Sequence, residues 1–151
     1  MTPELRETLA MVANAAADAR DAWWIIGSAA VVLHGGDVRY VRDVDLLMSA
    51  SDAEAFLKRV GVERRRVTGD ERFRSQVFGT WISPPLPIEA FGGFELAVGG
   101  AWREIALSTR EAVTVGGACV FVPSAEELVR LMRSFGRPKD LERARLLERR
   151  N

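Results

Sequence analysis

Two short stretches decide the fold of this 151-residue chain: Trp23-Trp24-Ile25-Ile26-Gly27-Ser28 and Asp43-Val44-Asp45-Leu46-Leu47-Met48. The first is an apolar run that ends at a glycine and continues into residues 29–33, which predicts a strand, a turn and a short helix. The second predicts a strand, and because side chains alternate between the faces of a strand, Asp43 and Asp45 point to the same side. Two carboxylates on one face can bind one divalent cation or a close pair of them.

The turn between the first strand and its helix has a chemical interpretation as well. Gly27-Ser28 begins the helix, and the free N–H groups at a helix N-terminus favour anions such as phosphate. We expect Ser28 both to cap its helix and to contact a phosphate. The two stretches therefore predict a metal-binding element beside an element that binds a triphosphate.

Length and charge limit the possible classes of protein. A chain of 151 residues is long enough to bury a core, so residues 1–151 are expected to form a single domain. The 21 basic and 21 acidic residues cancel, so net charge gives no general attraction to nucleic acid or to an anionic membrane. The basic segment Arg64-Arg65-Arg66 is either a solvated surface or a small RNA contact.

Cysteine content and hydropathy indicate the compartment. Cys119 is the only cysteine, which excludes an internal disulfide, and its apolar neighbours predict a buried strand thiol. The N-terminus carries Glu4, Arg6 and Glu7 where a secretory signal would be apolar, and no apolar stretch is long enough to span a membrane. These features predict a cytoplasmic protein with no membrane partner.

The rest of the chain predicts alternating helices and strands. The expected helices begin at Thr2-Pro3, Ser28, Ser51, Ser124 and Pro138, and residues 51–54 and 124–127 each predict a capping box with the serine as the cap. The expected strands are residues 22–26, 43–48, 73–82, 86–91, 102–107, 112–115 and 118–122. The first helix is expected to end near Ala19. The short apolar run of residues 22–26 is expected to be a central strand that is covered on both faces.

Four segments of the chain resemble the nucleotidyltransferase superfamily typified by DNA polymerase β: Gly27-Ser28, Leu33-His34-Gly35, Asp43-Val44-Asp45-Leu46 and Gly136-Arg137-Pro138-Lys139-Asp140-Leu141. Within it the chain is most similar to the small bacterial branch that includes the AbiEii-type toxins of type IV toxin–antitoxin systems. The resemblance covers about residues 23–147. It implies the nucleotidyltransferase fold, an α/β (α+β) domain with a central mixed β-sheet flanked by helices and with helices at its C-terminal end.

The resemblance also implies a metal-dependent site. A divalent cation, Mg²⁺ or Mn²⁺, would join a nucleoside triphosphate to Asp43, Asp45 and a third acid on a later strand, which by position is Glu89. The third acid of the family is usually aspartate, and the longer side chain of Glu89 moves its carboxylate by about an ångström. Glu95 and Glu104 are the alternatives for the same place.

Four further residues are expected to bind the nucleotide: Gly27, Ser28, Arg42 and Lys139. Arg42 either steadies a phosphate or offsets a neighbouring acid. Lys139 either places a cation near the triphosphate or is an exposed lysine in the first turn of a helix. Asp140 either orients Lys139 or favours the start of that helix.

The predicted function is transfer of a nucleoside monophosphate from a nucleoside triphosphate to an acceptor hydroxyl. The acceptor stays open: RNA such as tRNA or a protein, as in a toxin–antitoxin system, or an antibiotic such as an aminoglycoside or a lincosamide. A catalytically degenerate nucleotide-binding or partner-binding module of the same fold is the alternative. Because the chain is short for an enzyme that holds a large acceptor, a homodimer, a cognate antitoxin or a separate helical partner is expected to complete the site.

Overall fold

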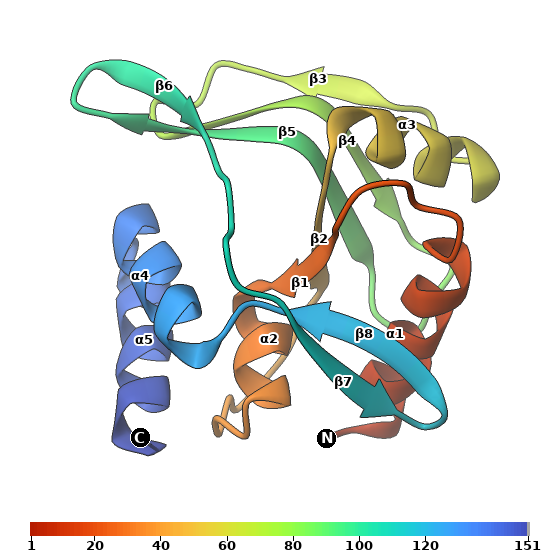
Figure 1. The fold of residues 1–151 in the computed structure, drawn as a ribbon, viewed down its shortest axis with the longest axis horizontal. Coiled ribbons are helices and arrows are strands. Elements are labelled where there is room, and N and C mark those ends of the chain that lie inside the picture. The colour runs from red at the N-terminus through yellow and green to blue at the C-terminus, as the bar shows by residue number, and fades with distance from the viewer. Residues whose placement is uncertain (151) are drawn as a thin grey trace.

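The computed structural model describes residues 1–150, which form a six-stranded mixed β-sheet, a two-stranded hairpin and five helices (Figure 1). The helices are α1 (Pro3–Ala15), α2 (Gly27–Leu33), α3 (Ala50–Arg59), α4 (Ala125–Phe135) and α5 (Pro138–Arg150). The strands of the sheet are β1 (Trp24–Ile26), β2 (Val44–Met48), β3 (Arg65–Val67), β4 (Phe73–Trp81), β5 (Ile88–Val98) and β6 (Ala101–Glu104). The hairpin consists of β7 (Glu111–Val115) and β8 (Ala118–Val122).

The sheet has the order β1-β2-β5-β4-β3, with β6 pairing to the far end of β5. Only the β2·β5 pair is parallel, so these two strands run side by side and end at the same edge of the sheet. The expectation of a central strand at residues 22–26 is wrong, since β1 is a three-residue edge strand. Its apolar side chains are buried because α2 and β8 pack against it.

The helices cover the two faces of the sheet unequally. Gly92 on β5 faces α3, because a Cβ placed there would lie 2.5 Å from the Cβ of Ala53. Glu89 and Phe91 have the opposite parity on β5 and point to the other face. On that side α2 packs against α4 and α5, which lie next to each other (Figure 1).

One cluster of buried apolar side chains joins the sheet, the hairpin and all five described helices. It includes Leu9 of α1, Leu46 of β2, Val120 of β8 and Leu147 of α5, each no more than 1% exposed. The inward-facing positions of α1, α4 and α5 follow the helical period that the sequence shows. This hydrophobic core thus supports the ends of the strands.

The start of α3 differs from the prediction. Ser49 caps the helix by accepting a hydrogen bond from the backbone N–H of Asp52, so the predicted cap at Ser51 is wrong. The Asp52 carboxylate accepts hydrogen bonds from the backbone N–H groups of Arg20 and Asp21, and therefore anchors the loop that follows α1. That loop replaces the last turn of the predicted first helix, which ends at residue 15 instead of near residue 19.

The start of α4 confirms half of its predicted capping box. The Ser124 hydroxyl accepts a hydrogen bond from the backbone N–H of Glu127. The Glu127 carboxylate does not return to the backbone of Ser124 but accepts hydrogen bonds from Ser108 and Thr109. It therefore anchors the segment between β6 and β7 to α4.

Two further expectations about the strands are corrected. Cys119 is exposed on β8, so the predicted buried thiol is wrong. Strand β5 is longer than predicted and continues through Gly92-Gly93 to Val98, where it pairs with β4 and β6. None of the helices in residues 1–150 combines the length and the apolar character that a membrane crossing requires.

Candidate active site

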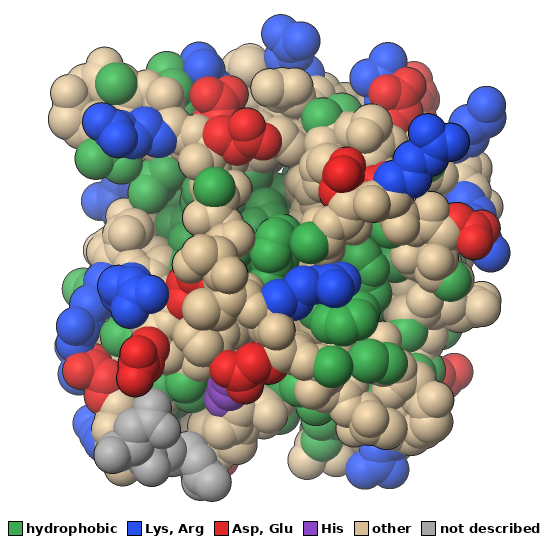
Figure 2. Space-filling view, viewed as in Figure 1, with side chains coloured by type: hydrophobic (Ala, Val, Ile, Leu, Met, Phe, Trp, Pro, Cys, Tyr) green, Lys and Arg blue, Asp and Glu red, His purple; other side chains and the backbone are tan. Residues whose placement is uncertain are grey.

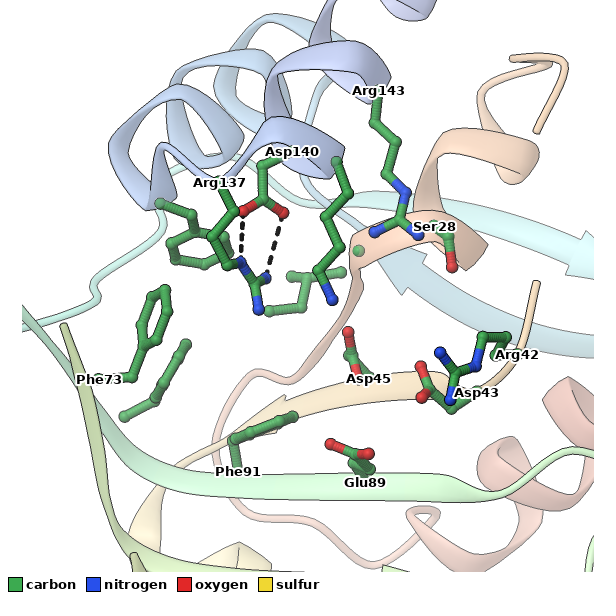
Figure 3. A pocket seen from close by; sticks show the side chains of 15 residues that line it. Ser28, Arg42, Asp43, Asp45, Phe73, Glu89, Phe91, Arg137, Asp140 and Arg143 are labelled. Atoms are coloured by element: carbon green, nitrogen blue, oxygen red, sulfur yellow. Dashed lines mark hydrogen bonds and ion pairs between the residues drawn. The ribbon is translucent and has the colours of Figure 1, made fainter. Parts of the chain in front are cut away.

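A cavity of about 390 Å³ lies where β2 and β5 approach α2 and α5 (Figure 3). Its volume is within the range of small-molecule sites in proteins. All seven residues that the sequence singled out for metal or nucleotide binding line this cavity: Gly27, Ser28, Arg42, Asp43, Asp45, Glu89 and Lys139. These residues come from segments up to 112 positions apart, from Gly27 to Lys139, so the fold brings them together.

Strand pairing places the acids beside each other. In the parallel β2·β5 ladder Asp45 is the register partner of Glu89, and Asp43 precedes Asp45 by one strand period. Figure 3 shows the three carboxyl groups pointing into the same space. Among the described residues, none donates a hydrogen bond to these carboxylates or forms an ion pair with them.

The electrostatics of the acids follow from this arrangement. Burial, followed by the charges of Asp43 and Glu89, raises the pKa of Asp45 from 3.8 to about 7. Burial and the charge of Asp43 also raise the pKa of Glu89. Lys139 and Arg137 oppose both shifts without cancelling them. The cavity floor therefore gains stability from any positive charge that binds beside the carboxylates.

The chemistry of these side chains fits a hard divalent cation. Carboxylate oxygens are the ligands that Mg²⁺ and Mn²⁺ prefer, and the oxygens of Asp43, Asp45 and Glu89 are not committed to protein donors. Within residues 1–150, no three His, Cys, Asp or Glu side chains are grouped closely enough to hold a metal ion as they stand. The three acids therefore have suitable oxygen ligands for a divalent cation, but as they stand they do not form a closed coordination site.

Gly27 holds α2 against the acids. Its φ of +69° lies in the left-handed region, and a Cβ at this position would lie 2.6 Å from Oδ2 of Asp45. Ser28 follows as a buried residue that lines the cavity. The expected cap at Ser28 is wrong, because the N-cap residue is Ile26 and no side chain caps this helix. The seven residues of α2 form only two turns, so its dipole is small.

Positive side chains also line the cavity. Arg42 and Lys139 are both exposed and line the cavity. The prediction that Asp140 orients Lys139 is wrong, because Asp140 accepts two hydrogen bonds from Arg137, at 2.6 and 3.2 Å. Asp140 does lie in the first turn of α5, which confirms its other expected role. Arg143, one turn further along α5, also lines the cavity (Figure 3).

Sequence reasoning missed two groups of cavity residues. They are two arginines, Arg137 just before α5 and Arg143 within it, and the aromatic residues Phe73, Phe91, Phe94 and Phe135. One local signal was present: Phe91 lies one strand period after Glu89 and therefore shares its face. The other aromatic residues read as core positions, since nothing in the sequence shows which strands and helices meet.

The alternatives for the third acid lie elsewhere. Glu95 forms a two-point ion pair with Arg74, with both N–O distances at 3.1 Å. Glu104 is exposed on β6, where it pairs with Glu95 in the β5·β6 ladder. Neither side chain lines the cavity, whereas Glu89 does.

The basic segment of residues 64–66 is partly engaged by the protein itself. Arg64 lies 3.4 Å from a carboxylate oxygen of Glu54, and the guanidinium of Arg65 packs over Phe78 on β4. Figure 2 shows basic and acidic side chains interspersed over one whole face, with no part of it reserved for one sign. These contacts favour the solvated-surface interpretation of the segment.

Comparison with known proteins gives structural matches only. No protein-family model and no curated protein matches this chain. The structure is similar to that of a protein from Thermotoga maritima classed as a nucleotidyltransferase, with a TM-score of 0.80 and 21% identity over 100% of this chain and 96% of the other.

Two proteins that act in antibiotic resistance or modification are also similar. The antibiotic-resistance factor ANT(2'')-Ia has a TM-score of 0.60 at 16% identity, covering 97% of this chain and 84% of its own. The lincosamide antibiotic adenylyltransferase LnuA has a TM-score of 0.52 at 15% identity, with coverages of 84% and 85%. At these identities the likeness concerns the backbone. The chain therefore has the nucleotidyltransferase fold.

Proposed function

We propose that this protein transfers a nucleoside monophosphate from a nucleoside triphosphate to an acceptor hydroxyl. The observation that carries the proposal is the meeting of Asp43, Asp45 and Glu89 with Gly27-Ser28 and Lys139 at one cavity. Three uncommitted carboxylates at a cavity lower the stability of the folded protein, so they require another reason to be there. Phosphoryl chemistry in this fold provides that reason.

The reaction that the residues support is an in-line displacement. The acceptor oxygen forms a bond to the α-phosphorus, the bond from that phosphorus to the bridging oxygen breaks, and pyrophosphate leaves. Arg42, Lys139 and Arg143 would bind the phosphate oxygens, since all three carry their charge to the cavity. Glu89 is suited to receive the hydroxyl proton, because its raised pKa makes the carboxylate a stronger base.

A divalent cation held by the three acids would neutralise the triphosphate and stabilise the charge that develops during transfer. Gly27 positions the Asp45 carboxylate for this task by bringing α2 within contact of it.

The charges of the cavity favour a neutral or anionic acceptor. Among the described lining residues, Asp140 is the one acid besides the three proposed metal ligands, and it is paired with Arg137. An aminoglycoside carries several positive amines and would meet the guanidinium and ammonium groups of Arg42, Lys139 and Arg143. RNA or a protein hydroxyl is thus favoured over a polycationic antibiotic.

The test is an assay of label transfer with all acceptor classes side by side. The purified protein is incubated with MgCl₂ or MnCl₂ and each α-labelled nucleoside triphosphate, together with total RNA, a protein extract, an aminoglycoside or a lincosamide. We expect label on RNA or protein, no label when EDTA is present, and normal transfer by the Glu95→Gln variant. Nucleotide binding without any labelled product would indicate a binding module in place of an enzyme. The absence of both nucleotide binding and transfer would refute the proposal.

A further inference from the structure

One wall of the cavity is aromatic, with two buried phenyl rings behind two that are partly exposed. Four phenyl rings form a continuous contact chain, with neighbouring centroids 5.0 to 6.0 Å apart: Phe73, Phe91, Phe94 and Phe135. Phe94 and Phe135 form the back, since they are only 7% and 6% exposed. Phe73 and Phe91 are partly exposed and line the cavity (Figure 3).

Two features of the chain put these rings on the cavity. Phe91 shares the face of Glu89 on β5, so it stands directly beside the acids. Gly93 has a φ of +62°, which interrupts the alternation of the strand, and Phe91 and Phe94 both line the cavity although three positions separate them. The wall thus belongs to the same site as the carboxylates.

A fixed guanidinium borders this wall. Arg137 donates from Nε to Asp140 at 2.6 Å and from Nη2 to the same carboxylate at 3.2 Å, and Asp140 is only 3% exposed. The guanidinium carbon also lies 5.1 Å from the ring centre of Phe73 and 5.9 Å from that of Phe135. Two hydrogen bonds and two rings fix the plane of the group, and within the described residues its Nη1 donates no hydrogen bond.

The combination of surfaces selects a kind of ligand. An aliphatic ligand would cover the rings but would leave the remaining N–H donors of Arg137 desolvated and without acceptors. A free phosphate would meet the guanidinium but would gain nothing from Phe91. A flat heteroaromatic ring satisfies both, because its face stacks on phenyl groups while acceptor atoms on its edge accept hydrogen bonds.

We propose that Phe73, Phe91 and Arg137 form a subsite for a nucleobase, and that Asp140 is a positioning residue that holds the Arg137 guanidinium. This inference is based on the proposed function, which places a nucleotide in the same cavity. The base can belong to the nucleoside triphosphate or to an acceptor nucleotide, since both offer the same flat ring with polar edges. The subsite then fixes which end of that nucleotide faces the acids.

The test compares ligands that share a triphosphate but differ in the base. Binding of each nucleoside triphosphate and of inorganic tripolyphosphate is measured by calorimetry for wild type, Phe91→Leu, Asp140→Asn and Arg137→Lys. We expect the three variants to lose roughly tenfold in affinity for the nucleotide and to bind tripolyphosphate nearly as wild type does. Arg137→Lys keeps the charge and removes the two-point pair, so it reports on the geometry if Asp140→Asn folds poorly.

A matched control comes from the hairpin. Phe121 on β8 also carries a guanidinium over its ring, that of Arg110 at 3.3 Å, but it lies outside this cavity. The Phe121→Leu variant should therefore bind nucleotide and tripolyphosphate as wild type does. A short single-stranded RNA forms the second arm of the test.

The outcomes separate the sources of the base. Loss of nucleotide affinity alone assigns the subsite to the triphosphate's base, and loss of RNA affinity alone assigns it to the acceptor's base. Equal losses for tripolyphosphate and nucleotide, or no loss of affinity for either nucleotide or RNA, would overturn the subsite. In the transfer assay Asp140→Asn should raise KM more than it lowers kcat. Transfer by Phe91→Leu with an unchanged KM for both substrates would refute the subsite alone, whereas nucleotide binding without transfer would refute the proposed function alone.

Discussion

Two sets of carboxylates in this molecule have opposite surroundings. Glu127, which is 8% exposed, accepts hydrogen bonds from Ser108 and Thr109, and these outweigh the effect of burial so that the pKa of Glu127 is lowered. Asp45 and Glu89 have no such donors among the described residues, and burial together with neighbouring acids raises the pKa of each. The first arrangement stabilises the fold, and the second destabilises it.

This difference separates the structural acids from the acids for which we propose a function. Asp52 belongs with Glu127, since it is 6% exposed and accepts two backbone hydrogen bonds that anchor a loop. The presence of a carboxylate that accepts hydrogen bonds is explained by the stability that it adds. A carboxylate that lowers stability is explained only by what it binds, and this is the physical basis for assigning the cavity acids to function.

The sharpest test of the comparison uses two glutamates of the same strand. Glu89→Gln should lower transfer by about a hundredfold, because it removes a charged ligand and the base. Glu95→Gln should leave transfer within about twofold of wild type, because its carboxylate pairs with Arg74 outside the cavity. Initial rates with labelled nucleotide measure both effects. Equal losses in the two variants would place the third acid elsewhere.

Removal of a structural acid should have its effect on stability. Glu127→Gln is expected to lower the free energy of unfolding by about 2 kcal/mol, because two backbone donors lose a charged acceptor. The exposed neighbour Glu126 provides the control, because Glu126→Gln should change the free energy of unfolding by less than about 0.5 kcal/mol. Urea unfolding measures both values.

Acid pH gives an independent check of the same residue. The folded-state pKa of Glu127 is lowered, so its contribution is present above the ordinary pKa and is lost as pH falls through the folded value. Wild type should therefore lose more stability on acidification than Glu127→Gln does. Parallel pH profiles for the two proteins would contradict the assignment.

Asp45 should show the opposite sign. Its pKa is raised to about 7, so the folded protein binds a proton more tightly than the unfolded chain and loses stability as pH rises from the ordinary value toward 7. Asp45→Asn removes this loss and should be more stable than wild type by about 1–3 kcal/mol at about pH 8 in EDTA. At about pH 5 the gain should be small. A less stable variant at both pH values would show that Asp45 has a structural partner.

Two glycines test how closely the fold approaches the proposed metal ligands. Gly27 and Gly61 have φ values of +69° and +75°, but a Cβ at Gly27 would lie 2.6 Å from Asp45, and one at Gly61 would meet nothing within 4 Å. Each alanine variant should lose about 1 kcal/mol from backbone strain. Only Gly27→Ala should also lose transfer, by roughly tenfold, because it displaces the Asp45 carboxylate. Equal activity of the two variants would remove Gly27 from the site.

Much of the candidate site could be predicted from local signals. The alternation of Asp43 and Asp45 and the glycine before Ser28 require only neighbouring residues to be recognised. Glu89 followed from the resemblance to the family, which implies a third acid on a later strand, and the parallel register of β2 and β5 explains why that position is suitable.

The remaining features depend on contacts between distant segments. The edge position of β1 and the aromatic wall both depend on which elements meet. The donors to Glu127 lie 18 and 19 residues earlier in the chain, so the capping-box sequence could not show which groups its carboxylate binds. Periodicity indicated Cys119 as part of a strand, but it could not decide which face of the hairpin the core covers.

The central claim is that the uncommitted acids serve nucleotidyl transfer. Its most direct test is transfer of α-label from a nucleoside triphosphate by wild type and Asp45→Asn, with unfolding of both proteins measured in parallel. The account predicts labelled acceptor with wild type and a loss of at least about a thousandfold in a variant that is fully folded. Undiminished transfer by folded Asp45→Asn would contradict it.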